Sequence, residues 1–86
     1  MLLHLAVIST LIWDESKRLS NLAKHGFDFL RAVDVLEGQH VVLSARQVGQ
    51  EERFLAIGVI GGRYATVVYT MRGEDHRIIS IRQAIV

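Results

Sequence analysis

The sequence predicts an α+β domain in which two short helices pack on one face of an antiparallel sheet of about four strands. Two patterns predict this class. Apolar residues at helical spacing are confined to the first 38 residues, and the apolar runs that follow are short and separated by glycine or charged residues. A chain of 86 residues has room for one modest core, so we expect a single domain spanning residues 1–86.

The first helix is expected between a short strand at residues 11–13 and Gly26. Asp14 can accept hydrogen bonds from the first free backbone N–H groups of this helix, and Gly26 can adopt the left-handed conformation that closes it. Spacing of i, i+3 and i+4 predicts that the helix is amphipathic, with an apolar face formed by Leu19, Leu22 and Ala23.

The second helix is expected to begin after Asp28, which can cap it, and to end at Gly38. Its predicted apolar face consists of Phe29, Val33 and Leu36.

Strands are predicted at residues 40–44, 53–60, 63–70 and 77–81. Gly61-Gly62 predicts a two-residue hairpin, because both central positions of a type I′ turn need a positive φ. The segment MRGEDH, residues 71–76, is expected to be a polar loop before a last strand that closes the sheet. Alternation in that strand predicts that Ile79 and Ile81 face the core. Ser80 and Arg82 are then expected to face outward.

Several classes of site find no support in the sequence. The lack of cysteine excludes disulfides and thiolate sites and fits a reducing cytoplasm. No glycine-rich phosphate loop or nucleophile elbow is present. The histidines stand in separate elements without metal-ligand spacing, so we expect neither a metal nor another cofactor at His4, His25, His40 or His76.

The opening segment MLLHLAVISTLIW is apolar but lacks the basic start and cleavage site of an export signal. It is also too short to span a membrane, because Asp14 follows directly. We therefore expect a cytoplasmic protein with no membrane partner, and we interpret this segment as a core strand with an irregular lead-in.

The net charge of +1 does not by itself indicate nucleic-acid binding, but the charges are uneven. Residues 63–86 contain four arginines and two acidic residues, a net of +2, whereas the first 62 residues contain six basic and seven acidic residues, a net of −1.

These basic residues suit RNA chemistry that needs no metal, in which the ribose 2′-hydroxyl attacks the adjacent phosphate. Such a reaction needs a base, an acid and cations that stabilise the phosphorane. Arginine pairs with phosphate through two parallel hydrogen bonds, which makes it the best cation for this purpose. We expect the cations to be Arg53, Arg72, Arg77 and Arg82, and His25 or Glu52 to act as base and acid.

Simpler interpretations remain open for the same residues. The arginines can be ordinary surface residues, and Lys24-His25 is explained by the helix dipole. Glu51, Glu52 and Arg53 can form a surface ion-pair cluster. Trp13 follows an apolar strand and is better explained as a core anchor than as a base-stacking residue, and Tyr69 is ambiguous in the same way.

Four ordered blocks of sequence resemble the BrnT-type toxin family. The first is W-D-E-x-K-x-x-x-N-x-x-K-H-G at residues 13–26, and EERFLAIG, VVYTMRG and RIISIRQA follow at residues 51–58, 67–73 and 77–84. The resemblance covers residues 11–84. It implies a RelE-like ribonuclease fold and a metal-independent endoribonuclease of a type II toxin-antitoxin system, which cleaves RNA and arrests growth.

The resemblance also implies partners and binding residues. A BrnA-like ribbon-helix-helix antitoxin is expected to neutralise the toxin, and operator DNA is bound only through that antitoxin. The residues expected to bind RNA beside the catalytic group are Lys17, Lys24 and Ser80, and Asn21 is another family-specific residue expected to contact RNA or antitoxin.

The chain departs from the family pattern at both ends. Residues 1–10 are an apolar extension that can cover the sheet or pair as an edge strand, and we expect the chain to lack the C-terminal helix usual in the family. Uncovered apolar sheet surface would favour self-association. The short C-terminus keeps open an alternative function as a catalytically inactive co-repressor that binds the antitoxin. A nonenzymatic RNA or DNA binder fits less well with the nearly neutral charge.

Overall fold

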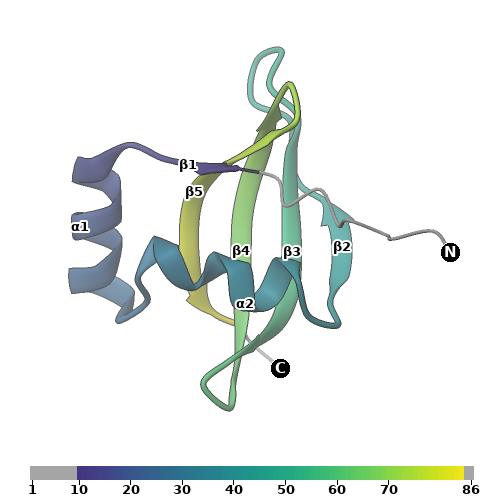
Figure 1. Ribbon diagram of the computed structural model, residues 1–86. Helices are drawn as coiled ribbons and strands as arrows, with labels where there is room; N and C mark the ends of the chain where they lie inside the picture. The colour runs from purple at the N-terminus through teal and green to yellow at the C-terminus, as the bar shows by residue number, and fades with distance from the viewer. Residues whose placement is uncertain (1–9, 85–86) are drawn as a thin grey trace, which may run out of the picture.

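The computed structural model describes residues 10–84 and contains a five-stranded sheet with helices on one side (Figure 1). The elements in chain order are β1 (Leu11–Ile12), α1 (Glu15–His25), the 3₁₀ turn η1 (Phe29–Arg31), α2 (Ala32–Leu36), β2 (Val41–Ser44), β3 (Arg53–Ile60), β4 (Arg63–Arg72) and β5 (Asp75–Gln83). The predicted α+β class is confirmed, as are strands at all five predicted places. The expectations for residues 1–9 concern a segment outside the described residues.

The sheet is mixed rather than antiparallel. Its strand order is β1-β5-β4-β3-β2, and β1 pairs in parallel with β5 through Leu11 and His76. The prediction of an antiparallel sheet of about four strands was therefore slightly off, because β1 adds a fifth, parallel strand outside β5. A two-residue parallel pairing has no hairpin signal in the sequence, so its place in the sheet could not be predicted.

The hairpin between β4 and β5 is tighter than predicted. Arg72 pairs directly with Asp75, which leaves only Gly73 and Glu74 as the turn. Gly73 has a φ of 61°, the left-handed conformation that such a turn requires. The segment MRGEDH is thus mostly strand, and the expected polar loop at residues 71–76 was wrong.

A β-bulge changes which residues of β5 face the core. Val68 pairs with Ser80, but the next residue, Tyr69, pairs with Ile78, so Ile79 is the extra residue. Ile78 and Ile81 are therefore both buried in the core. The predicted core pair of Ile79 with Ile81 was wrong at Ile79, because simple alternation does not hold across a bulge.

The second helix is a 3₁₀ turn continued by one short α-helical turn. Asp28 caps it as predicted, with its side chain accepting a hydrogen bond from the backbone N–H of Leu30. The predicted apolar face was only partly right, because Val33 is half-buried and the residues in the core are Phe29, Ala32 and Val35. The 3₁₀ start changes the spacing of this face to every third residue.

Helix α1 begins and ends as predicted. Asp14 accepts a hydrogen bond from the backbone N–H of Ser16 at 2.9 Å, and Gly26 closes the helix with a φ of 75°. Its predicted apolar face was wrong, however, since Leu19 and Leu22 are exposed and Asn21 is the buried residue of the helix. Helix α1 lies beside the sheet, next to β5 and β1, while α2 crosses one face (Figure 1).

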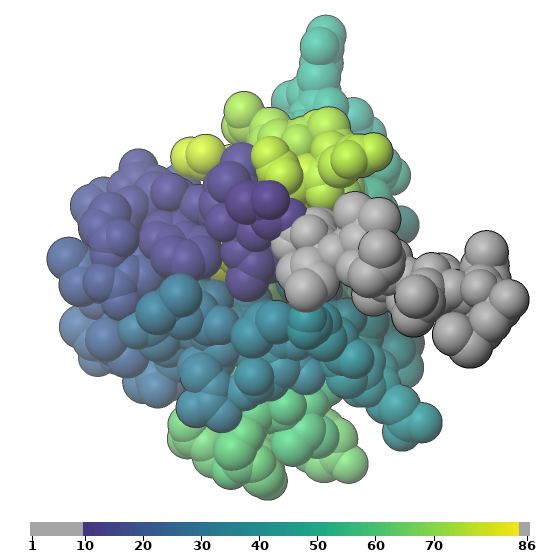
Figure 2. All heavy atoms as spheres, viewed as in Figure 1, coloured from purple at the N-terminus to yellow at the C-terminus, as the bar shows by residue number. Residues whose placement is uncertain are grey.

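The core lies between η1, α2 and one face of the sheet. Alternate residues of the central strands meet the helices there, among them Ala56, Tyr69 and Ile78. Figure 2 shows this covered side, with α2 packed across the sheet and the loop between β2 and β3 projecting from one end. The opposite side, which we call the helix-free face, carries the other set of alternate residues. No helix within residues 10–84 is long and apolar enough to cross a membrane.

Candidate functional site

The strand register places the four predicted arginines on the helix-free face. Arg53 pairs with Thr70, and Thr70 pairs with Arg77, so these residues form one row across three strands. Directly paired residues share a face of a sheet, and their neighbours along the strand point to the other side. Two further arginines have the same orientation, since Arg72 is two residues beyond Thr70 and Arg82 pairs with Thr66.

Glu51 connects two of these arginines at the end of the sheet where β3 begins. Its carboxylate lies 3.3 Å from Arg53 and 3.7 Å from Arg72. The acid or base candidate predicted from sequence is the neighbouring Glu52, which is exposed and whose backbone oxygen accepts a hydrogen bond from the Thr70 hydroxyl at 2.7 Å. The signal for Glu51 was available, because residues two apart in an extended chain point the same way.

A pocket of about 660 Å³ opens at this end of the sheet. Its lining includes Glu51, Glu52 and Arg72 together with uncharged side chains of β3 and β4. Glu52 and Arg72, both expected in the catalytic group, are thus brought to one place.

A second, smaller pocket lies between α1 and β5. It has a volume of about 200 Å³, and its lining consists of Lys17, Ser20, Asn21, Lys24, His25, Ile79 and Ser80. The three residues expected to bind RNA beside the catalytic group therefore meet here, together with His25. Because Ser80 pairs with Val68 next to the bulge, this pocket opens on the helix-free face.

Asn21 fixes α1 against β5 at the floor of this pocket. Its side-chain amide donates to the backbone oxygens of Phe27 at 3.0 Å and Ile81 at 2.8 Å. Its carbonyl oxygen accepts from the backbone N–H of Ile81 and from the hydroxyl of Ser80, both at 3.2 Å. Asn21 is only 7% exposed, whereas a side chain in direct contact with RNA would lie at the surface.

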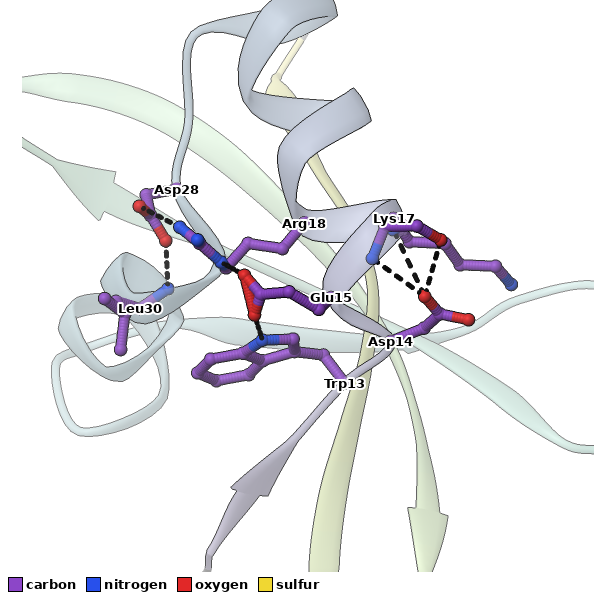
Figure 3. A network of polar contacts seen from close by, with 8 residues as sticks. Trp13, Asp14, Glu15, Lys17, Arg18, Asp28 and Leu30 are labelled. Atoms are coloured by element: carbon purple, nitrogen blue, oxygen red, sulfur yellow. Dashed lines mark hydrogen bonds and ion pairs between the residues drawn. The ribbon is translucent and has the colours of Figure 1, made fainter.

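The start of α1 is held by a second set of polar contacts, shown in Figure 3. Arg18 pairs with Glu15 and also with Asp28 at 2.8 Å, which ties α1 to the start of η1. Trp13 donates to Glu15 at 3.3 Å, and its ring packs edge-to-face on Phe29 with centroids 6.3 Å apart. Trp13 is therefore a core anchor, as predicted.

Two of the predicted arginines flank the smaller pocket along β5. Ser80 is three residues from Arg77 and two from Arg82, which corresponds to roughly 10 and 7 Å along an extended strand. The acid and base candidates are not brought together, however, since Glu52 lines the larger pocket and His25 the smaller one.

Two residues with shifted pKa values lie on the covered side of the sheet, and neither lines these pockets. Burial raises the pKa of Tyr69, whose ring stacks on Phe54 in the core. Burial also lowers the pKa of His76, which lies against Tyr69. Tyr69 is thus a core residue, which resolves its ambiguity. Within residues 10–84, no group of three or more His, Asp or Glu residues is placed to hold a metal ion.

Comparisons with known proteins agree with this architecture. Residues 13–85 match the family model described as the ribonuclease toxin, BrnT, of type II toxin-antitoxin systems. The structure is similar to the 1.1 Å crystal structure of the Brucella abortus ribonuclease toxin BrnT, with 30% sequence identity and a TM-score of 0.67. That match covers 91% of this chain and 99% of the Brucella chain. No curated protein sequence matches the chain. The chain belongs to the BrnT family of ribonuclease toxins of type II toxin-antitoxin systems.

Proposed function

We propose that this chain cleaves RNA on its helix-free face through attack of a ribose 2′-hydroxyl on the adjacent phosphate, without a metal. The observation that carries the proposal is the convergence of basic side chains on one face. Arg53 and Arg77 share a row, and Arg82 follows on the same strand as Arg77. Three basic groups of α1 line the pocket beside that strand. Cations on one surface stabilise a phosphorane and bind the flanking phosphates.

The proposal assigns different tasks to the two ends of this face. Arg53, Arg72 and Arg77 bind phosphates at the end of the face where β3 begins, since Arg53 and Arg77 share a row. Arg82 binds the reacting phosphate beside Ser80. Lys17 and Lys24 supplement them beside Ser80. His25 or Glu52 moves the proton of the attacking hydroxyl. The position of His25 beside Ser80 favours His25 for the step near β5, because a base must lie within hydrogen-bonding reach of its proton.

The family to which the chain belongs supports the partners that we propose. A BrnA-like ribbon-helix-helix antitoxin neutralises the toxin, and the complex binds operator DNA through the antitoxin alone. The fold is proposed to be of the RelE-like ribonuclease type.

A second candidate function is that of a catalytically inactive co-repressor that binds the antitoxin. Apolar residues on the β2 and β3 side of the helix-free face favour it, because Val41, Leu43 and Val59 are each close to half exposed or more. Exposed apolar patches mark protein contacts. The same surface fits self-association.

The test is induced expression of the chain in a bacterial host, alone and together with the antitoxin, followed by RNA cleavage assays in EDTA with the purified chain. We expect growth arrest that the antitoxin reverses and cleavage that EDTA does not stop. Arg77→Ala and Arg82→Ala are expected to abolish both effects. The matched control is Arg31→Ala, which removes an exposed arginine on the helix-covered side.

The outcomes separate the two functions. Normal growth and intact RNA with a folded protein that still binds the antitoxin would refute the ribonuclease function and favour the co-repressor. Equal loss of cleavage in Arg31→Ala would show that the helix-free face has no special part in it.

A further inference from the structure

The orientation of the Asn21 amide is fixed by its surroundings. Two backbone oxygens, those of Phe27 and Ile81, lie 3.0 and 2.8 Å from one side-chain atom of Asn21. A carbonyl oxygen can only accept a hydrogen bond, so that atom must be the amide nitrogen. The other atom, which receives the backbone N–H of Ile81, must then be the oxygen.

This orientation determines the direction of the Ser80 hydroxyl. The Ser80 oxygen lies 3.2 Å from the Asn21 oxygen, which has no proton to donate. The proton between them must therefore come from Ser80. Because a hydroxyl has one proton and two acceptor lone pairs, Ser80 presents only lone pairs to the pocket.

The pocket thus combines two kinds of group. Lys17, Lys24 and His25 line it from α1 and attract a phosphate, whereas the Ser80 oxygen on β5 can accept a hydrogen bond. An acceptor of this kind does not suit a phosphate oxygen, which itself only accepts. It suits a hydroxyl beside the phosphate, and the ribose 2′-hydroxyl is the group that distinguishes RNA from DNA.

We propose that Asn21 and Ser80 form a ribose-reading site, in which Ser80 accepts a hydrogen bond from the 2′-hydroxyl and Asn21 holds Ser80 in the accepting orientation. This inference rests on the proposed function, since it assigns a ribonucleotide to the α1–β5 pocket. Ser80 is a binding residue in this site, and Asn21 is a positioning residue that acts through Ser80. This role would explain why the buried Asn21 is part of the family sequence pattern.

The test uses ligands that contain no internucleotide bond, so that cleavage does not interfere. Ribonucleoside 3′-monophosphates and their 2′-deoxy counterparts are titrated into the labelled, full-length chain, and binding is followed by NMR shifts of the α1 and β5 resonances. The wild-type chain is expected to bind the ribonucleotides about three- to tenfold more tightly, the effect of one net hydrogen bond.

The variants separate reading of the ribose from structural support. Ser80→Ala is expected to remove the ribose preference while deoxynucleotide binding is unchanged, and Ser80→Thr, which keeps the hydroxyl, is expected to restore it. Ser20→Ala is the matched control, because it removes a hydroxyl that lines the same pocket from α1. It should leave the preference intact.

Three results would overturn the inference: equal affinity of the wild-type chain for both sugars, equal weakening of both by Ser80→Ala, or shifts confined to residues outside the pocket. These results do not depend on cleavage. A chain that reads ribose but leaves RNA intact would refute the ribonuclease function alone, and a chain that cleaves RNA without a ribose preference would refute the reading site alone.

Discussion

The carboxylate of Glu51 lies 3.3 Å from the guanidinium of Arg53, at the end of the sheet where β3 begins. It also lies 3.7 Å from Arg72, so one acidic group is shared by two of the arginines proposed to bind RNA. A phosphate that approaches this end of the face must compete with Glu51 for both. We therefore expect these ion pairs to weaken RNA binding in the wild-type chain.

We expect Glu51→Gln to bind RNA more tightly, because it releases two cations and removes one negative charge. The salt dependence should also become steeper, by about 0.7 in the slope of log K against log salt for each additional phosphate bound by a single strand. The measurement is a titration of single-stranded RNA at several salt concentrations. Glu52→Gln is the matched control. It removes the same negative charge, but Glu52 makes no ion pair with either arginine. Equal gains in both variants would mean that net charge alone, and not release of the arginines, determines affinity.

Strand alternation predicts the outward position of Arg82 but not that of Arg77, because the bulge at Ile79 lies between the two residues and shifts the alternation. β3 matches its predicted bounds, and the paired hairpins then bring Arg53 and Arg77 into one row. The bulge at Ile79 and the parallel pairing of β1 could not be predicted in this way, since both depend on contacts between distant residues. The bulged residue Ile79 lines the α1–β5 pocket, so the shape of this pocket could not be predicted either.

His76 predicts a loss of stability in mild acid. Its ring lies 5.0 Å from that of Tyr69 between centroids, and its Nδ1 atom is buried without a hydrogen-bond partner among the described residues. Burial lowers the pKa of His76 below 6.5, with nearby His40 lowering it further and Asp75 opposing the shift. The unfolded chain therefore binds more protons than the folded chain between these two pKa values, so the free energy of unfolding falls as pH falls below about 6.5.

Replacing His76 with Phe should flatten this pH dependence, because an aromatic ring of similar shape remains without a titratable group. The check is urea unfolding at several pH values between about 5 and 8. His25→Gln serves as the control, since His25 is exposed on α1. The explanation fails if the slope in His76→Phe equals that of the wild-type chain.

Gly58 allows the segment after α2 to pass close to β3. A Cβ atom at this position would lie 3.0 Å from the side chain of Val35 and 3.3 Å from the backbone oxygen of Gln39. We expect Gly58→Ala to lower the free energy of unfolding by roughly 1–3 kcal/mol, the usual cost of overpacking. Val59→Ala, at the next and nearly half-exposed position, should cost under about 1 kcal/mol. Urea unfolding of both variants measures the difference, and a loss in Gly58→Ala no larger than that in Val59→Ala would contradict crowding at this site.

Helix α1 provides the sharpest contrast between sequence pattern and structure. Its leucines follow helical spacing, yet Leu19 is 53% exposed, and the contact with β5 is made by Asn21. β1 pairs with β5 only at His76 and Arg77, so the backbone N–H and C=O at Ile81 need another partner. One side-chain amide can accept from the N–H and donate to the C=O, which explains the polar residue at this position. Hydrophobic periodicity gives no indication of such a contact.

The two residues should therefore respond oppositely to substitution. Leu19→Gln is expected to change the free energy of unfolding by no more than about 0.5 kcal/mol, as is usual for surface positions. Asn21→Ala is expected to cost about 1–3 kcal/mol or more, because it leaves backbone groups of Phe27 and Ile81 without partners. Urea unfolding with matched m-values gives both quantities. A large loss in Leu19→Gln with little change in Asn21→Ala would mean that α1 packs through its leucines, and the pocket between α1 and β5 would then have a different shape.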